Sequence, residues 1–250
     1  MRLKCLGCEV LARAVYFCAA HSPHIVDVEL FEQGLHDTPS SLRVKLQTQI
    51  DGAVGQGYDA VVLSYGLCGK ATEGLQAKDV PLVIPRAHDC ITLFLGSRAR
   101  YQQEFEKNPG TYWFANDYVE RAKRAGSTLT MGSVGPNADT QALHEQYVAK
   151  YGKDNADYLM EVMSGWSKHY NRAVFVDMGV GDASIAERTA QENAEKRGWT
   201  FERIAGDLVL IRRLLDGEWE KDFLILQPGE ENALSYDEQV ICARRGAMNT

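Results

Sequence analysis

Short apolar segments that alternate with helical segments constrain the fold of this chain more than any other feature. Asp59 to Ser64 and Pro81 to Pro85 are apolar almost throughout, which is typical of strands buried on both faces of a parallel sheet. Two further strands are expected at Arg2 to Leu6 and Ile25 to Phe31, with helices over 9–20 and from Thr38 or Ser40 to about 54. This order favours a parallel sheet covered by helices.

The strand–helix pattern returns after a middle segment that is rich in aromatic residues. Helices are expected over 90–105, 140–166 and 183–197, and strands over 173–178, 201–204 and 223–226, with 208–215 either strand or helix. The sequence therefore predicts an α/β fold of two doubly wound, mostly parallel units joined by a helical, aromatic-rich segment. The expected boundaries are 1–107, 108–170 and 171–250.

Charge and hydropathy exclude several classes of partner. The 250 residues carry a net charge of −7, which argues against binding to nucleic acid or an anionic membrane, since both favour a basic surface. No apolar run reaches the roughly 20 residues of a transmembrane helix, and the first segment is a poor signal peptide. We therefore expect a cytoplasmic protein whose six cysteines stay reduced instead of forming disulfides.

Three cysteines follow three of the predicted strands. Cys8 follows the first strand, Cys68 the third and Cys90 the fourth, with His88 beside Cys90. Because sites in open α/β sheets form beyond the carboxyl ends of the strands, these side chains are expected to converge. Thiolates and imidazole bind zinc, and thiolates also hold iron–sulfur clusters. The sequence predicts a metal site of Cys8, Cys68, His88 and Cys90.

The other cysteines have a simpler interpretation, because free cysteine is among the most buried residue types. Cys18 lies on the apolar face of a predicted helix, and Cys242 has no turn signal near it, so both are interpreted as packing residues. Cys5 precedes Cys8 in a C-x-x-C pattern but lies inside the strand, and whether it or His88 completes the site stays open.

Residues around the cysteines are expected to support the site. Gly66 and Gly69 allow tight turns and a close approach to a bound group, which makes them candidate cofactor-binding residues together with Arg98. Arg86 and Tyr112 are candidate catalytic residues that bind an anionic substrate, and Arg86 is also expected to stabilise the thiolates.

The Gly179-Val180-Gly181-Asp182 segment lies between a predicted strand and a predicted helix. Such a turn cradles an anion in some proteins. It lacks the third glycine of a dinucleotide fingerprint and the lysine of a P-loop, so a tight turn is the favoured interpretation and a ligand loop the alternative.

Two resemblances bear on function. His88-Asp89-Cys90 resembles the His-x-Cys zinc motif of enzymes that activate a thiol for methyl transfer, although the further cysteine in those enzymes lies downstream and here Cys8 and Cys68 lie upstream. Nearly the whole chain resembles the family called domain of unknown function 1638, through the segments 65–69, 81–90, 95–98 and 109–113. That resemblance implies an association with corrinoid-dependent methyl metabolism in bacteria and archaea.

Three functions fit these observations. The first is an enzyme or accessory factor of corrinoid-linked methyl-group transfer, in which zinc activates a thiol and the partner is a small-molecule substrate or a corrinoid protein. The second is an iron–sulfur redox or corrinoid-reactivation protein. The third is a non-catalytic protein-binding module with a structural metal.

Overall fold

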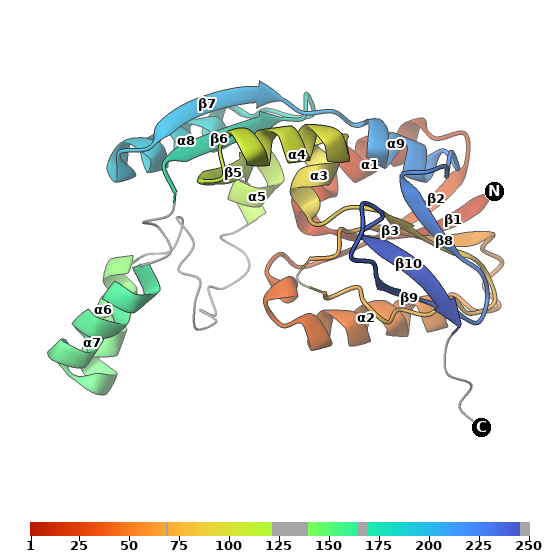
Figure 1. Ribbon diagram of the computed structural model, residues 1–250, viewed down its shortest axis with the longest axis horizontal. Coiled ribbons are helices and arrows are strands. Elements are labelled where there is room, and N and C mark those ends of the chain that lie inside the picture. Colours follow the sequence, from red (N-terminus) through yellow and green to blue (C-terminus); the bar gives the residue numbers. More distant parts are fainter. Residues whose placement is uncertain (69, 122–139, 165–169, 246–250) are drawn as a thin grey trace.

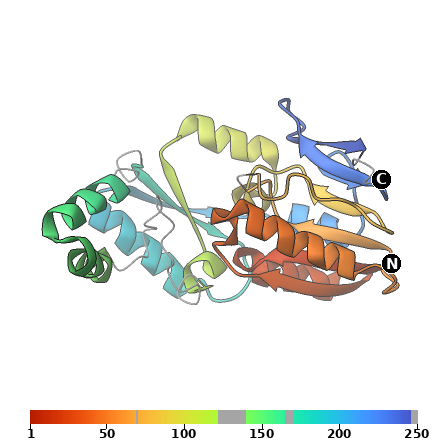
Figure 2. The ribbon, with the colours of Figure 1, turned by 90° about the horizontal axis from the view of Figure 1, so that it is seen from below.

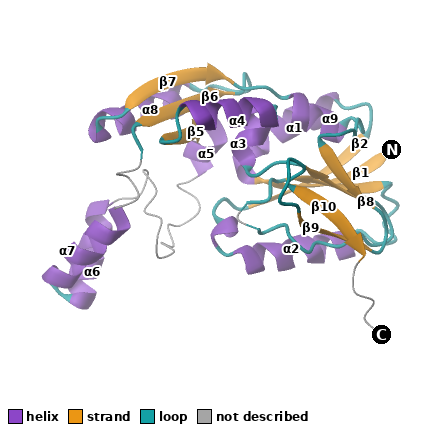
Figure 3. Ribbon diagram, in the orientation of Figure 1, coloured by secondary structure: helices purple, strands orange, loops and turns teal. Residues whose placement is uncertain are grey.

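A five-stranded and a three-stranded sheet organise the fold, and a two-stranded hairpin forms a third sheet. The computed structural model describes residues 1–68, 70–121, 140–164 and 170–245. Figure 3 shows its strands in distinct groups, with helices between them. We call the part built on the larger sheet the first lobe and the part built on the three-stranded sheet the second lobe. The mixed α/β class and the mostly parallel pairing confirm the predicted fold class.

The larger sheet has the strand order β2-β1-β3-β4-β8. Its first four strands are parallel, and β8 pairs with β4 in the antiparallel direction. The strands are β1 (Arg2–Cys8), β2 (Ile25–Phe31), β3 (Ala60–Ser64), β4 (Leu82–Pro85) and β8 (Phe223–Leu226). Strands β3 and β4 are buried throughout, as their apolar sequences predict. The strands that precede the three cysteines, β1, β3 and β4, are therefore neighbours.

Helices cover both faces of this sheet (Figure 1). The 3-10 helix η1 (Glu9–Leu11), α1 (Ala12–His21) and α9 (Val209–Leu215) lie on one face, and α2 (Pro39–Gly52) lies on the other. Leu42, Leu46 and Ile50 recur along α2 at helical spacing and are buried against the sheet. The segment 208–215 is thus helical rather than a strand.

The smaller sheet has the order β5-β6-β7, and all its pairs are parallel. Its strands are β5 (Thr111–Ala115), β6 (Arg172–Asp177) and β7 (Thr200–Ala205), packed on α8 (Ser184–Arg197), with α5 (Asn116–Arg121) following β5. The chain thus enters this sheet at β5 and leaves it after β7, because the apolar strand β8 pairs with β4 of the first sheet. Each of these two sheets thus takes strands from two of the expected segments, and the expected boundaries at 107 and 170 stay a prediction.

Glycines divide two of the predicted helices. Gly96 adopts a left-handed backbone with φ of 69°, which ends α3 (Cys90–Leu95) before α4 (Arg98–Lys107) begins. Gly152, with φ of 79°, separates α6 (Thr140–Tyr151) from α7 (Lys153–Ser164). The pair of helices α6 and α7 lies at the end of the molecule away from the first sheet (Figure 2). A hairpin of β9 (Glu230–Leu234) and β10 (Ile241–Arg245) was not anticipated.

The carboxyl end of the second sheet packs against the carboxyl end of the first. The amide of Asp207, after β7, donates to the carbonyl of Phe94 in α3 at 2.9 Å. Across the same junction, the Arg13 guanidinium in α1 donates to the Asp117 carboxylate in α5 at 2.7 Å. The loops that follow β1, β3 and β4 therefore lie where the two lobes meet. No helix in the described ranges has both the length and the apolar character needed to cross a membrane.

Candidate functional site

The thiols of Cys8, Cys68 and Cys90 come together at the carboxyl ends of three adjacent strands. Cys8 is the last residue of β1, Cys68 lies in the loop after β3, and Cys90 is the first residue of α3, after β4. The latter two loops are joined directly, since the amide of Cys68 donates to the carbonyl of His88 at 2.9 Å. Each of the three thiols interacts electrostatically with at least one other. We call Cys8, Cys68 and Cys90 the thiol cluster.

The thiol cluster is not arranged as a closed coordination shell. Among the residues described, no three His, Cys, Asp or Glu side chains stand as a metal-binding group. Cys8 is buried, whereas Cys68 and Cys90 are partly exposed. The sulfur atoms are therefore gathered at the junction of the lobes, on one buried residue and two that are partly exposed.

Burial keeps these thiols protonated at neutral pH. Burial raises the pKa of Cys8 to about 11, an effect that the amide of Val10 partly offsets. Burial, followed by interaction with Cys8 and Asp89, raises the pKa of Cys68 to about 12. The pKa of Cys90 lies well above its ordinary value for the same leading reason. A ligand that takes these groups as thiolates must therefore displace their protons.

The backbone of the loop after β3 is specialised at two positions. A Cβ on Gly66 would lie 2.6 Å from the Cα of Asp89, so only glycine permits the two cysteine-bearing loops to touch. Cys68 itself adopts a left-handed conformation with φ of 46°, which is uncommon for a residue with a side chain. Gly66 thus serves the approach of the neighbouring loop. Gly69 lies outside the described residues.

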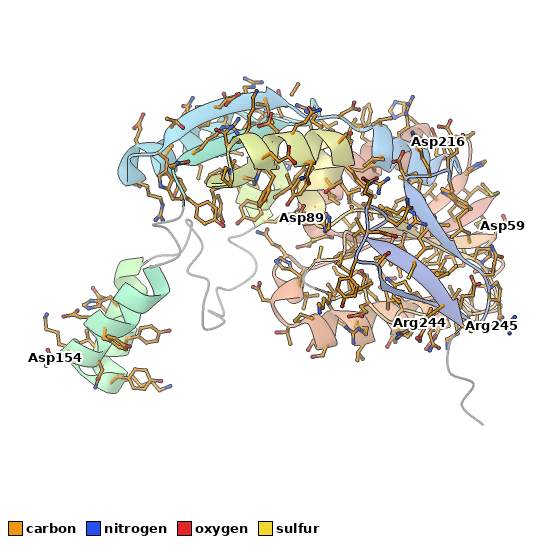
Figure 4. The ribbon with its side chains drawn as sticks, viewed as in Figure 1. Asp59, Asp89, Asp154, Asp216, Arg244 and Arg245 are labelled. Atoms are coloured by element: carbon orange, nitrogen blue, oxygen red, sulfur yellow. The ribbon has the colours of Figure 1, made fainter. Side chains whose placement is uncertain are left out.

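Asp89 orders the loop that carries His88 and Cys90. One carboxylate oxygen caps α3 by accepting from the amides of Ile91 and Thr92, and the other accepts from the Tyr101 hydroxyl at 3.2 Å. Asp89 lies at the centre of the molecule, near the junction of the lobes (Figure 4). The imidazole of His88 is exposed, and its ring centroid lies 6.3 Å from that of Tyr101. A role for His88 as a metal ligand stays a prediction.

Two tyrosines that the sequence did not single out lie beside the thiols. Tyr65 follows β3, is 2 % exposed and interacts electrostatically with Cys8 and Cys68. Tyr118, from α5 in the second lobe, interacts with Cys90 and shares a short hydroxyl–hydroxyl contact with Tyr112. The position of Tyr65 directly after a buried strand was a usable signal, whereas nothing in the sequence near Tyr118 points to the first lobe.

The remaining predicted site residues lie elsewhere. The guanidinium of Arg86 donates to the carbonyls of Gln239 and Ile241, and that of Arg98 donates to the carbonyl of Glu238. Both side chains thus hold the end of the β9–β10 hairpin. Tyr112 is packed among aromatic residues of the second lobe and shares a hydroxyl contact with Tyr118, which interacts with Cys90. Their catalytic and cofactor-binding roles stay predictions.

The other cysteines lie apart from the thiol cluster in the packing of the fold. Cys5 is fully buried within β1, and Cys18 is buried on α1 beside α9. Cys242 lies in β10, with its thiol 3.7 Å from the carbonyl of Leu234.

The glycine-containing turn after β6 is packed against the first lobe. Asp177 accepts from the amide of Gly179 at 2.9 Å, and the carbonyl of Asp182 accepts from Asn116. A Cβ on Gly181 would lie 2.9 Å from the side chain of Arg13. These contacts favour the interpretation of the segment as a tight turn.

Comparisons with known proteins agree with the resemblance seen in the sequence. No curated protein matches the chain significantly. A family profile described as "Protein of unknown function (DUF1638)" matches residues 30–215, which span β2 to α9 and include Cys68, His88 and Cys90. The chain belongs to the DUF1638 family.

Proposed function

We propose that the chain is a metal protein in which the thiol cluster provides three sulfur ligands, with zinc as the first candidate metal. The observation that carries this proposal is the position of the three thiols, which lie at the carboxyl ends of three adjacent parallel strands. Thiolate sulfur is the preferred donor for zinc and for iron–sulfur clusters. Backbone hydrogen bonds join the two loops that carry Cys68 and Cys90.

Several features of the chain fit this donor set. The raised pKa values mean that metal binding releases up to three protons, so affinity should increase as the pH rises toward the thiol pKa values. The exposed imidazole of His88 lies on the same loop as Cys90 and is the proposed fourth ligand. If His88 does not coordinate the metal, the three sulfur ligands leave a fourth coordination position for a substrate, as in catalytic zinc sites.

We further propose methyl-group transfer of the corrinoid-linked kind as the reaction, carried out as an enzyme or as an accessory factor. Zinc, when bound, lowers the pKa of a coordinated thiol and keeps it nucleophilic. In the transfer, a bond forms between carbon and the acceptor sulfur while the cobalt–carbon bond breaks, and its electron pair stays on cobalt. The partial exposure of Cys68 and Cys90 supports a site that a substrate can reach.

Metal content tests the centre directly. The protein is purified without oxygen, and its zinc, iron and sulfide are measured for the unchanged chain and for Cys8→Ser, Cys68→Ser, Cys90→Ser and Cys18→Ser. We expect about one zinc per chain in the unchanged protein and in the Cys18→Ser control, and a sharp loss in the other three. Iron with sulfide in place of zinc would select the iron–sulfur alternative. Metal that survives Cys68→Ser and Cys90→Ser refutes the centre.

The reaction is tested separately with methylcobalamin and a small thiol. Transfer would produce cob(I)alamin, which is followed by its absorption, and Cys68→Ser should abolish it. A zinc-loaded protein without such transfer would favour the third function, a protein-binding module with a structural metal.

A further inference from the structure

The hydroxyl of Tyr65 is a buried donor whose side-chain neighbour is the thiol of Cys8. Tyr65 is 2 % exposed, and its hydroxyl makes no hydrogen bond to a nitrogen or oxygen atom among the described residues. Leaving a buried hydroxyl unsatisfied destabilises a fold. Such groups are rare in folded proteins, and their presence beside a site calls for a physical reason.

The surroundings of Tyr65 place that hydroxyl at the thiol cluster. Tyr65 follows Ser64, the residue of β3 that lies opposite Gly7, so it lies beside the end of β1 that carries Cys8. Its ring centroid lies 6.4 Å from that of Phe31, the residue of β2 opposite Cys8. Its hydroxyl interacts electrostatically with the thiols of Cys8 and Cys68.

A neutral thiol and a thiolate differ strongly as acceptors. Neutral sulfur is a weak acceptor, so a buried hydroxyl whose neighbour is a neutral thiol is poorly satisfied. A metal-bound thiolate carries negative charge, and hydrogen bonds to charged groups are roughly twice as strong as neutral ones. The unsatisfied donor is thus arranged for the deprotonated state of its neighbour.

We infer that Tyr65 is a positioning residue whose hydroxyl donates a hydrogen bond to the Cys8 thiolate when the thiol cluster holds a metal. This inference rests on the proposed metal centre. The hydroxyl orients the sulfur toward the metal and withdraws electron density from it. Ligands of a metal are commonly fixed in this way by a second group, whose removal weakens binding about 10- to 100-fold.

Tyr65→Phe separates this role from an ordinary structural one. The substitution keeps the ring and removes a poorly satisfied donor, so the thermal stability of the metal-free protein should stay the same or rise. Zinc affinity, measured by competition with a chromophoric chelator, should fall about 10- to 100-fold. In the cobalt(II)-loaded protein, the sulfur-to-cobalt charge-transfer band should move to lower energy because the thiolate loses its donor.

Tyr58→Phe is the matched control. The Tyr58 hydroxyl donates to Asp27 at 2.9 Å, away from the thiol cluster, so its loss should lower metal-free stability and leave zinc affinity unchanged. Unchanged affinity and an unchanged cobalt band in Tyr65→Phe would overturn the inference while leaving the metal centre intact. A Tyr65→Phe protein that is less stable or unfolded without metal would also overturn it, because the hydroxyl would then be satisfied already. Absence of metal binding by the unchanged chain would remove the proposed centre itself.

Discussion

Gly66 holds the two cysteine-bearing loops in contact, and its lack of a side chain is the reason they fit. Gly66→Ala would place a Cβ 2.6 Å from the Cα of Asp89, against backbone that cannot rotate away. Forced overpacking of this kind costs about 1–3 kcal/mol, so we expect a lower midpoint of urea unfolding together with reduced metal content. The control is Gly52→Ala at the end of α2, where a Cβ meets open space and should not destabilise the protein. Equal stability of the two variants would contradict the expectation.

For single residues, the sequence predicts those positions that depend on the local strand pattern. The convergence of Cys8, Cys68 and Cys90 was predictable because strand ends converge in a parallel sheet, while their role as metal ligands stays a prediction. Arg86 was given a site role because it precedes His88, but its hydrogen bonds go to a hairpin more than 150 residues later, which no local pattern indicates. Tyr65 directly follows the same buried strand as Cys68, and that position is the signal that was missed.

Among the elements, the short helix α3 depends on its cap more than on its length. The Asp89 side chain accepts from the amides of Ile91 and Thr92, which have no partner inside the helix. Asp89→Ala should therefore lower the free energy of unfolding by about 0.5–2 kcal/mol, measured with urea on the metal-free protein. Asp89→Asn keeps an accepting oxygen and should retain most of that stability. If both variants unfold at the same urea concentration, the cap does not carry the effect.

Whether a segment is a helix or a strand was predictable where one local rule dominated, but the residues at which these elements end were not. The apolar runs of β3 and β4 were read correctly because a fully buried strand leaves few alternatives. The expected helix over 90–105 breaks at Gly96, whose left-handed backbone follows from packing against Asp207 in the other lobe. The β9–β10 hairpin gave no signal because Val240, rather than glycine, adopts the positive φ near its turn.

At the scale of the whole molecule, the sequence indicates which segments are strands but not which sheet each strand joins. Periodicity identifies β8 as a strand, but its pairing with β4 depends on the chain returning through α9 after building the second sheet. The consequence is that the two lobes are linked by two passages of the chain, and both carboxyl edges border the thiol cluster. Contacts between lobes should therefore influence the site.

Asp117 is the most buried of the charged groups that join the lobes in the described ranges, at 5 % exposure. Its carboxylate accepts from the amide and guanidinium of Arg13 and from Arg121, which also reaches Glu9 next to Cys8. Asp117→Ala should cost about 2–3 kcal/mol, less than the roughly 3–5 of a fully buried pair, because both arginines stay partly exposed.

The loss should also loosen the lobe junction and not only lower global stability. Hydrogen exchange should therefore become faster in the segments 9–13 and 116–121 of Asp117→Ala, beyond the change that reduced global stability explains. Glu120→Gln is the control, since Glu120 contacts the same Arg13 at 2.6 Å from a more exposed position and should cost less than about 1 kcal/mol. Equal exchange in the two variants would show that Asp117 stabilises its own helix without tying the lobes, because a contact that couples two bodies must protect amides on both of them.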